Sequence, residues 1–531
     1  MAIKMERELY EWQEECLKRW FANKGRGIVQ AVTGSGKTYL ALTAAARMEE
    51  KAGKNFHVKI IVPTGALMQQ WNRALREFLS DSCTEEISPA NLGKKIGLRG
   101  CGSKSASDCK YMIYVINSAR YEVARQILTE LKQGDAVLLI ADECHHYASG
   151  QNKLIFEFLP YIKQYQDHFF SLGLSATLPS GQPQRYLTSV LGRKIYDYDM
   201  EKASLYHTIC PYDVYHISLT FFPSERAEYE ELSDRMTLLY RKLLNACPSL
   251  AALDQKDRYE LLRHLSGDKN RKIAEMASLY MRLSFKRKNL VCLASARTAC
   301  TCDLLARLND SEKIIIFSER TKQADKLYQL LQGSYPEKVG RYHSKMGKWA
   351  NKNVLDRFRE GSVRILIACK AIDEGIDVPD VSIGIIMSGT STQRQRIQRL
   401  GRIIRKNNGK DHSSLYYLHI TETSEDSCFL PDAAGRRLFE LTYDSYKHLF
   451  TNPAYDERAL SLLNSMQNAQ IGEERLQEAA RCLQLGCIRT DWLLEQDDIE
   501  KKIKNAKYIS DKNYWVCMKK LSLIAKKEGQ E

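Results

Sequence analysis

The chain has 531 residues, enough for about two to four domains that each bury a hydrophobic core. Charged residues make up 27% and hydrophobic residues 44% of it, which excludes a disordered or membrane-embedded class and is ordinary for a globular protein. Lys and Arg outnumber Asp and Glu by 79 to 65, and the formal net charge of +14 favours a polyanionic partner, although excess charge also serves solubility alone.

Cysteine spacing and hydropathy indicate the compartment. The 15 cysteines include no C-x-x-C pair, so a zinc ribbon or a disulfide framework is disfavoured and reduced thiols in a cytosol are the simpler interpretation. No signal peptide opens the sequence, and no apolar run reaches membrane-spanning length. We therefore expect a cytoplasmic protein with no membrane partner.

The first 22 residues have apolar side chains at helical spacing and predict an amphipathic helix that contains Gln13. A glutamine amide both donates and accepts hydrogen bonds, so Gln13 can read the edge of an adenine. A plain packing helix explains the same pattern.

The stretch Ala-Val-Thr-Gly-Ser-Gly-Lys-Thr at residues 31–38 follows an apolar strand pattern and precedes a helical one. Gly34 and Gly36 allow the backbone to bend until successive N–H groups face one anion at a helix N-terminus. Lys37 adds a positive charge toward the outer phosphates, and the Thr38 hydroxyl can bind a magnesium ion. The stretch predicts a nucleoside-triphosphate site, with Ala31 where the usual pattern has its first glycine.

Two further strands, at residues 58–63 and 111–116, end in polar residues. Thr64 follows the first and opens a helix, so it can hold a nucleic acid phosphate or simply cap that helix. Ser118 follows the second, as another polar strand end on the same edge.

An apolar strand at residues 136–141 delivers Asp142 and Glu143 at its carboxyl end, where open parallel sheets bind ligands. Asp142 can hold magnesium and Glu143 can polarise the water that attacks a γ-phosphate. We expect the adjacent His145 and His146 to lie on an extended segment and to point to opposite sides, as packing or coupling residues. A later strand ends in Ser-Ala-Thr at residues 175–177, whose hydroxyls can hydrogen-bond the acidic pair.

In that order and spacing, Thr-Gly-Ser-Gly-Lys-Thr (33–38), Asp-Glu-Cys-His (142–145) and Ser-Ala-Thr (175–177) resemble motifs I, II and III of superfamily 2 helicases. The second half resembles motifs IV to VI, with Lys-Ile-Ile-Ile-Phe-Ser (313–318), Asp-Glu-Gly-Ile-Asp-Val-Pro (373–379) and Gln-Arg-Leu-Gly-Arg-Ile-Ile-Arg (398–405). The last two variants look most similar to the branch that holds the repair translocase XPB and the motor subunits of type I and type III restriction enzymes.

The resemblance implies roles for individual residues. ATP would be gripped by Gln13, Thr33, Gly34, Ser35, Gly36, Lys37 and Thr38 from the first lobe and approached by Gly375, Asp377 and Gln398 from the second. Thr38 and Asp142 would hold Mg²⁺. Lys37, Glu143 and two arginine fingers, Arg402 and Arg405, would form the catalytic set.

The resemblance also implies an α/β fold of two tandem RecA-like parallel-sheet domains, with a helical insertion and a helical C-terminal domain. We expect the first lobe at residues 1–200, a connecting segment with the insertion at 201–310, the second lobe at 311–423 and the helical domain at 424–531. Lys286, Arg287 and Lys288 in the insertion can contact phosphates, or can belong to a solvated helical linker.

These patterns predict an ATP-dependent DNA translocase or helicase that acts on duplex or single-stranded DNA. An RNA helicase and an ATP-gated binding subunit that separates no strands are the alternatives. A nuclease, or another subunit of anti-phage defence or repair, is the expected protein partner. A Glu-x-Lys sequence at residues 500–502 mimics a restriction nuclease, but it lies on a helical pattern and therefore argues little for nuclease activity.

Overall fold

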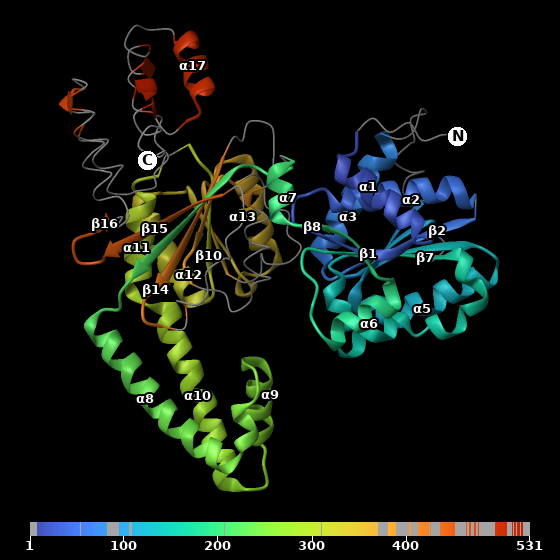
Figure 1. Ribbon diagram of the computed structural model, residues 1–531, viewed down its shortest axis with the longest axis horizontal. Helices are drawn as coiled ribbons and strands as arrows, with labels where there is room; N and C mark the ends of the chain where they lie inside the picture. The colour runs from blue at the N-terminus through green and yellow to red at the C-terminus, as the bar shows by residue number, and fades with distance from the viewer. Residues whose placement is uncertain are drawn as a thin grey trace.

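The computed structural model contains two eight-stranded sheets, each the centre of its own lobe (Figure 1). It describes residues 8–53, 55–81, 95–105, 109–206, 208–308, 311–369, 381–388, 403–404, 412–423, 425, 436–451 and 494–506, and single positions between 464 and 523. No described helix is long and apolar enough to cross a membrane.

The first sheet has the strand order β4-β3-β5-β2-β6-β7-β1-β8, and its strands are parallel except for the β3–β4 pair. Its strands are β1 (Arg26–Ala31), β2 (Phe56–Val62), β3 (Ile96–Gly100), β4 (Ser103–Lys104), β5 (Tyr111–Val115), β6 (Ala136–Ala141), β7 (Phe169–Ser175) and β8 (Lys194–Tyr198). Central strands such as β6 are buried along their whole length, which is why they appear in the sequence as unbroken apolar runs.

Helices cover both faces of the first sheet (Figure 1). They are α1 (Glu11–Ala22), α2 (Lys37–Ala52), α3 (Gly65–Asp81), α5 (Ile116–Lys132), α6 (Gln182–Leu191) and α7 (Met200–Leu205), with short 3-10 helices η1 (Cys144–Ala148), η2 (Gly150–Phe156), η3 (Leu159–Tyr161) and η4 (Lys163–His168). Because all the long strands run in one direction, the polar segments that follow β1, β2, β5, β6 and β7 lie along one edge of the sheet.

The second sheet has the order β11-β12-β10-β13-β14-β9-β15-β16 and is parallel except for the β15–β16 pair. Its strands are β9 (Tyr212–Leu219), β10 (Ile314–Ser318), β11 (Val339–Tyr342), β12 (Ile365–Cys369), β13 (Ile383–Ile386), β14 (Ser413–Ile420), β15 (Arg436–Asp444) and β16 (Leu449–Thr451). The helices of this lobe are α11 (Ser295–Leu305), α12 (Thr321–Ser334), α13 (Lys348–Glu360) and the 3-10 helix η6 (Ser344–Met346).

Two parts of the second sheet come from outside the stretch 311–423. The strand β9 belongs to the stretch expected to be a connecting segment, and it lies between β14 and β15. The strands β15 and β16 belong to the stretch from residue 424 onward, for which we expect helices. That stretch also contains the helix α17 (Gln496–Asn505). The exact domain limits stay predictions.

A long helical arm projects from the second lobe (Figure 1). It consists of α8 (Pro223–Ala246), η5 (Pro248–Ala251), α9 (Gln255–Leu265) and α10 (Arg271–Leu293), which agrees with the helical insertion expected from the sequence. The arm leaves the carboxyl end of β9 and returns beside the carboxyl end of β10, where Gln323 Nε2 donates to Cys292 O at 2.7 Å. The arm therefore borders the ligand-binding edge of the second sheet.

Candidate nucleotide-binding site

The loop between β1 and α2 has the conformation that a phosphate cradle requires. Gly34 and Gly36 both have φ 91°, and Gly36 is the left-handed N-cap of α2. A positive φ of this size favours glycine, which explains why glycines occupy these two positions of the loop. The buried Ser35 hydroxyl donates to Val32 O at 2.8 Å and helps to close the turn. The first turn of α2 has N–H groups with no partner within the helix, and such a helix N-terminus favours an anion.

Gln13 on α1 contacts this loop directly. Its Nε2 donates to Gly36 O at 3.0 Å, while its Oε1 accepts from the backbone N–H of Tyr10 at 2.9 Å. The side chain is only 2% exposed, and a Cβ added to Gly36 would lie 2.8 Å from Gln13 Nε2. Gln13 thus lies against the glycine loop, and hydrogen bonds at both polar atoms of its amide hold the side chain in place. Its role as an adenine reader stays a prediction.

Lys37 folds over the same loop. Its Nζ donates to Ala31 O at 2.7 Å and to Val32 O at 3.1 Å, so the ammonium group lies above the turn between β1 and α2. Its charge also favours the ionised form of the Asp142 carboxyl group, against the burial that raises the pKa of that group. Lys37 and Asp142, 105 positions apart in the chain, are therefore close enough for their charges to interact.

Asp142 lies at the carboxyl end of β6 and is 7% exposed. Burial raises the pKa of this carboxyl group above its usual range, and the hydrogen bond from Trp71 and the charge of Lys37 oppose that rise. Trp71 Nε1 donates to Oδ2 at 2.7 Å, and the Glu143 N–H donates to Oδ1 at 3.0 Å. Both oxygens are therefore held in fixed directions, as a metal-binding carboxylate requires.

Glu143 has a left-handed backbone conformation, with φ 47° and ψ 52°. Its Oε2 lies 3.4 Å from His145 Nδ1, and His145 Nδ1 lies 2.9 Å from Ser175 Oγ. The acidic motif after β6 and the Ser-Ala-Thr motif after β7 are thus linked through one imidazole.

One detail of our expectations for this region is wrong. His145 and His146 lie on the 3-10 helix η1 with ring centroids 4.2 Å apart, and not on opposite sides of an extended segment, because the chain turns immediately after Asp142. Ser175 Oγ lies 2.9 Å from His145 Nδ1. A hydrogen bond from the Ser-Ala-Thr hydroxyls to the acidic pair itself stays a prediction.

These residues fit a magnesium–ATP complex. The glycine turn offers space and N–H donors for phosphates, Lys37 offers a positive charge, and Asp142 offers a buried, oriented oxygen ligand. Thr33 and Thr38 lie on the same loop and first helical turn. The Oγ1 of Thr33 is buried without a hydrogen-bond partner among the described residues, as expected for a donor that a ligand satisfies.

The two strand-end residues proposed to contact nucleic acid differ in their surroundings. Thr64 Oγ1 accepts from the Leu67 N–H at 3.3 Å, so it caps α3, one of the two roles considered. Ser118 is part of α5, which begins at Ile116 immediately after β5, and does not lie on a polar strand end. Both positions lie at the carboxyl edge of the first sheet.

The basic run at residues 286–288 of α10 contacts other parts of the chain. Lys286 pairs with Glu228 at 2.8 Å, and Lys288 Nζ lies 4.0 Å from Glu319. Arg287 donates to Ser233 Oγ at 3.2 Å. Lys286 and Lys288 remain half-exposed or more, whereas Arg287 joins α10 to α8.

The second-lobe residues Gly375, Asp377, Gln398, Arg402 and Arg405 lie outside the described residues. The two isoleucines between the arginines are described, and both are buried. Ile404 O accepts from the Cys210 N–H at 2.8 Å, and Ile403 O accepts from Ser413 Oγ at 3.0 Å. Ile403 and Ile404 are thus attached to β14 and to the segment that leads in from the first lobe.

Sequence reasoning missed several residues that build the site. Trp71 and Tyr147 are fully buried beneath the acidic pair, and Tyr147 Oη donates to Ile61 O at 2.8 Å and to Asp142 O at 3.1 Å. An aromatic residue with a polar end at helical spacing is indistinguishable from core in the sequence. Only the fold brings the indole to the carboxylate.

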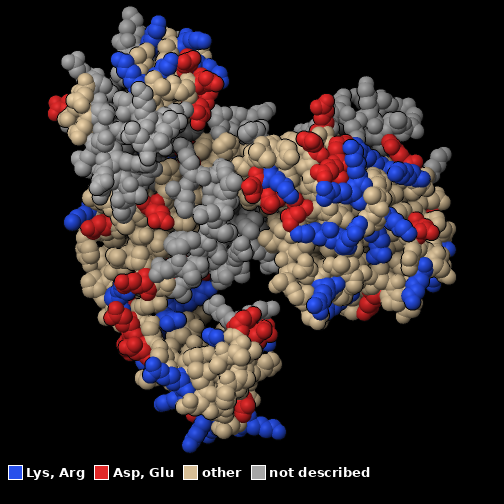
Figure 2. All heavy atoms as spheres, in the orientation of Figure 1, with Lys and Arg blue, Asp and Glu red and all other residues tan. Residues whose placement is uncertain are grey.

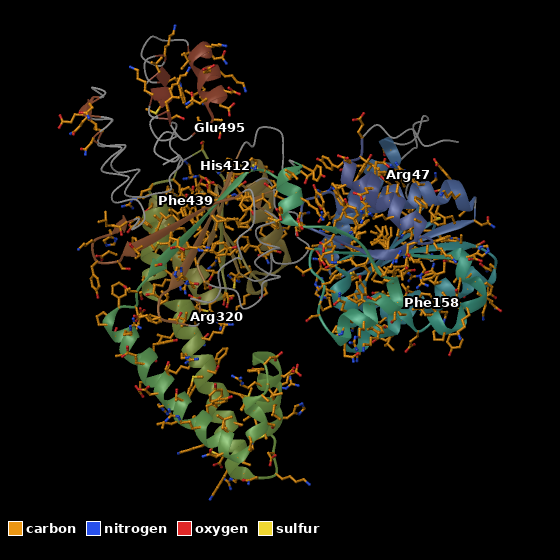
Figure 3. All side chains as sticks on the ribbon, in the orientation of Figure 1. Arg47, Phe158, Arg320, His412, Phe439 and Glu495 are labelled. Carbon is orange, nitrogen blue, oxygen red and sulfur yellow. The ribbon has the colours of Figure 1, made fainter. Side chains whose placement is uncertain are left out.

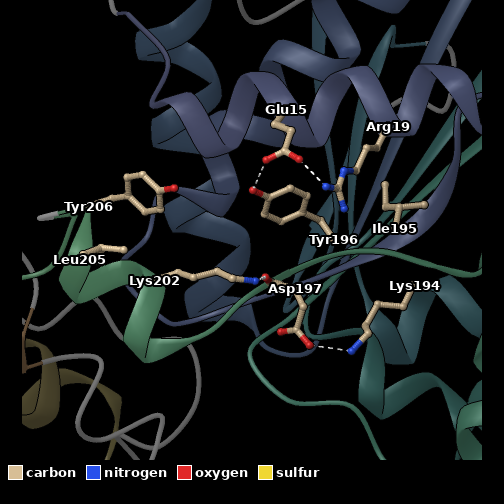
Figure 4. Close-up of a pocket in the computed structure, with 9 residues that line it drawn as sticks. All are labelled: Glu15, Arg19, Lys194, Ile195, Tyr196, Asp197, Lys202, Leu205 and Tyr206. Carbon is tan, nitrogen blue, oxygen red and sulfur yellow. Dashed lines mark hydrogen bonds and ion pairs between the residues drawn. The ribbon is translucent and has the colours of Figure 1, made fainter. Parts of the chain in front are cut away.

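A separate cavity of about 540 Å³ lies on the other side of α1 (Figure 4). Glu15 and Arg19, which line it, are on the helical face opposite Gln13. Its charged groups are already engaged: Glu15 accepts from Tyr196 Oη at 2.7 Å, and Lys194 pairs with Asp197 at 2.6 Å. Because these charged groups already have partners in the chain, we assign no function to this cavity.

The fold and this site define a two-lobed, RecA-like nucleoside triphosphatase. Residues 6–180 match the family model described as type III restriction enzyme, res subunit, and residues 296–407 match the helicase conserved C-terminal domain. The chain thus carries both domains of a superfamily 2 helicase.

Two curated relatives are similar to most of this chain. A protein of Sulfurisphaera tokodaii named DNA 3'-5' translocase XPB2 is 27% identical over 80% of this chain and 84% of its own length. The XPB subunit of general transcription and DNA repair factor IIH from Antonospora locustae is 22% identical over 78% of this chain. The chain spans 51% of that relative.

Among solved structures, the Pyrococcus furiosus Hef helicase domain has a TM-score of 0.51 at 17% identity, covering 80% of this chain and 99% of that one. A fragment of an HsdR subunit of a type I restriction enzyme from Vibrio vulnificus has a TM-score of 0.50 at 18% identity, covering 82% of this chain and 68% of that one. At these identities the likeness concerns the fold alone.

Proposed function

We propose that this chain is an ATP-dependent DNA translocase or helicase, which couples ATP hydrolysis to movement along DNA or to its remodelling. The observation that carries the proposal is that Lys37, on the glycine loop, and the oriented carboxylate of Asp142 lie at the same carboxyl edge of the first sheet, within reach of each other's charge. The relatives named DNA translocases support DNA as the track.

In the proposed reaction, the loop N–H groups and Lys37 hold the phosphates, while Thr38 and Asp142 hold Mg²⁺. The metal ion, when bound, neutralises phosphate charge and orients the γ-phosphate. Glu143 orients a water molecule and takes its proton as the water oxygen bonds to the γ-phosphorus, and the bond to ADP breaks. His145 Nδ1 lies 3.4 Å from the carboxylate of Glu143, on the side that leads to Ser175.

The second lobe would complete the site. Gly375, Asp377 and Gln398 would approach the nucleotide, and Arg402 and Arg405 would meet the charge that develops on the transferring phosphoryl group. Because ATP would be gripped from both lobes, its hydrolysis would release them, and each opening and closing would shift the grip on DNA.

The nucleic acid would lie along the carboxyl edges of the two sheets. Thr64 and Ser118 in the first lobe and Lys286, Arg287 and Lys288 in the arm are the proposed phosphate contacts. Lys and Arg side chains spread across the first lobe and gather at the tip of the arm in Figure 2, which supports a polyanionic partner.

ATPase assays with duplex DNA, single-stranded DNA and RNA test the proposal. We expect DNA to stimulate turnover more than RNA does; stimulation by RNA alone would favour an RNA helicase. Displacement of a triplex-forming strand or of a paired strand then separates a motor from an ATP-gated binding subunit, which would hydrolyse ATP and displace neither. Co-purification with a nuclease, or with another defence or repair subunit, would identify the protein partner.

A further inference from the structure

The second lobe exposes one large aromatic side chain at its ligand-binding edge. Trp349 is 78% exposed and lies in the first turn of α13, seven residues after the carboxyl end of β11. By contrast, Trp12, Trp20 and Trp71 are at most 3% exposed. Leaving an indole in water forgoes about 2 kcal/mol or more of burial, so an indole placed there needs an occupant to explain it.

The segment that carries Trp349 is firmly attached to the lobe. His343 is 4% exposed, and its Nε2 lies 3.1 Å from Asp325 Oδ1 on α12. Asn351 Nδ2 donates to His343 O at 3.0 Å, and the Met346 N–H donates to the same oxygen at 3.1 Å. The turn is thus fixed on both sides of the indole, which is presented by an ordered platform.

The surroundings of the indole are basic. Lys345 and Lys352, on either side of it in the chain, and Lys322 at the start of α12 are exposed. The carboxylate of Asp325 nearby is engaged by Arg341 at 2.5 Å as well as by His343. Positive charge therefore prevails among the residues just named, and it favours phosphate groups along this edge.

A second aromatic ring lies near the same edge. Phe285 on α10 is 60% exposed, and the guanidinium of Arg320, just after β10, lies 5.3 Å from its ring centroid. Figure 3 places Arg320 where the arm meets the second lobe. Because only β12 separates β10 from β11, the carboxyl ends of these two strands lie about 10 Å apart. Aromatic rings and cations thus alternate along one edge, which is the composition of a surface that binds unpaired strands.

We infer that Trp349 is a stacking platform for an unpaired base of the nucleic acid strand that crosses the second lobe, with Lys345 and Lys352 serving the adjacent phosphates. The inference rests on the proposed function and deepens it, because a base must be unstacked to reach the indole. In a duplex the bases are already stacked on each other, so Trp349 would contribute to the grip on single strands alone.

The test compares Trp349→Ala with the unchanged chain in binding a fluorescent oligothymidine, an abasic strand of equal length and a duplex. We expect the variant to lose roughly 5- to 100-fold in affinity for oligothymidine, and about twofold or less for the other two. Trp349→Phe should restore most of the loss, since a phenyl ring also stacks. Tyr161→Ala, which removes another exposed ring on the segment leading into the amino end of β7, is the matched control.

Three outcomes would overturn the inference. Unchanged affinity of Trp349→Ala for oligothymidine would show that no base stacks there. Equal losses on oligothymidine and on the abasic strand would assign the residue to backbone binding. Loss of self-association in light scattering, with unchanged strand affinity, would assign the indole to a contact with a second copy. If the unchanged chain binds no nucleic acid at all, the proposed function itself fails, which is a separate result.

Discussion

Trp71 Nε1 donates a 2.7 Å hydrogen bond to Oδ2 of Asp142, across 71 positions of the chain. The donor comes from α3, which follows β2, and the acceptor from the end of β6, which pairs with β2. The bond orients a carboxylate that burial would otherwise favour in its neutral form. The helix that is capped at Thr64 is thus connected to Asp142, the carboxylate proposed to hold Mg²⁺, so a contact at the N-terminus of α3 can be felt at that carboxylate.

Trp71→Phe should shift the acid limb of the ATPase pH profile to higher pH. The hydrogen bond lowers the pKa of Asp142, so its loss raises that pKa, and the ionised form that binds Mg²⁺ becomes populated only at higher pH. The profile of kcat/KM against pH, measured at several Mg²⁺ concentrations, reports the shift. Trp20→Phe removes a buried indole bond to Ser171 O and should leave the limb in place. An unmoved limb in both variants would contradict the role of Trp71.

Lys37→Ala should abolish ATP hydrolysis while the protein stays folded. The loop conformation depends on Gly34, Gly36 and the Ser35 hydroxyl, all of which remain, and only the charge aimed at the phosphates is lost. Turnover and thermal unfolding are the measurements, with Lys51→Ala at the other end of α2 as the control. Retained turnover would disprove the assignment of the site.

Glu143→Gln should bind ATP and hydrolyse it about 100- to 10,000-fold more slowly, the range that a positioned base contributes. The amide has the size of the carboxylate but cannot accept a proton from water. Nucleotide binding by fluorescence and single-turnover hydrolysis separate the two effects. Weak ATP binding, with proportionate loss of turnover, would place Glu143 in binding instead.

The variant Lys286→Gln with Lys288→Gln should flatten the salt dependence of duplex DNA binding. Each phosphate contact that is lost lowers the slope of log K against log salt by about 0.9, so we expect a decrease of about 1 to 2. Arg287 is left in place because its bond to Ser233 holds the arm together. An identical slope would assign both lysines to their partners Glu228 and Glu319 alone.

The sequence predicted the strands, the glycine turn and the acidic pair because each is a local pattern with its own period or backbone requirement. Gly36 at φ 91° and the fully buried β6 are examples in which the local pattern and the structure agree. The arm was predicted for the same reason, since its helices have clear helical spacing.

Other features depend on contacts between distant segments, and no local pattern reports them. The strand β15 pairs in parallel with β9, more than 200 positions earlier, so its place in the second sheet follows only from the fold. The bond from Trp71 to Asp142 and the attachment of His145 to Ser175 likewise require the folded sheet. The roles of Arg402 and Arg405 stay predictions from the resemblance.

Ser175→Ala should reduce the stimulation of ATPase activity by nucleic acid more than it reduces basal turnover. The hydroxyl contacts His145 Nδ1 at 2.9 Å and also donates to Thr177 O at 2.7 Å, so it connects the catalytic carboxylate to the chain that leaves β7. Without it, His145 keeps Glu143 as its neighbour at 3.4 Å but loses the link to that chain. Basal and DNA-stimulated kcat, with strand or triplex displacement, are the measurements.

Ser171→Ala is the matched control, because it removes a buried hydroxyl bond from the same strand, to Leu191 O, at a distance from the acidic pair. If both variants lower the two rates in proportion, the effect is one of stability, and the imidazole does not transmit the state of the nucleotide.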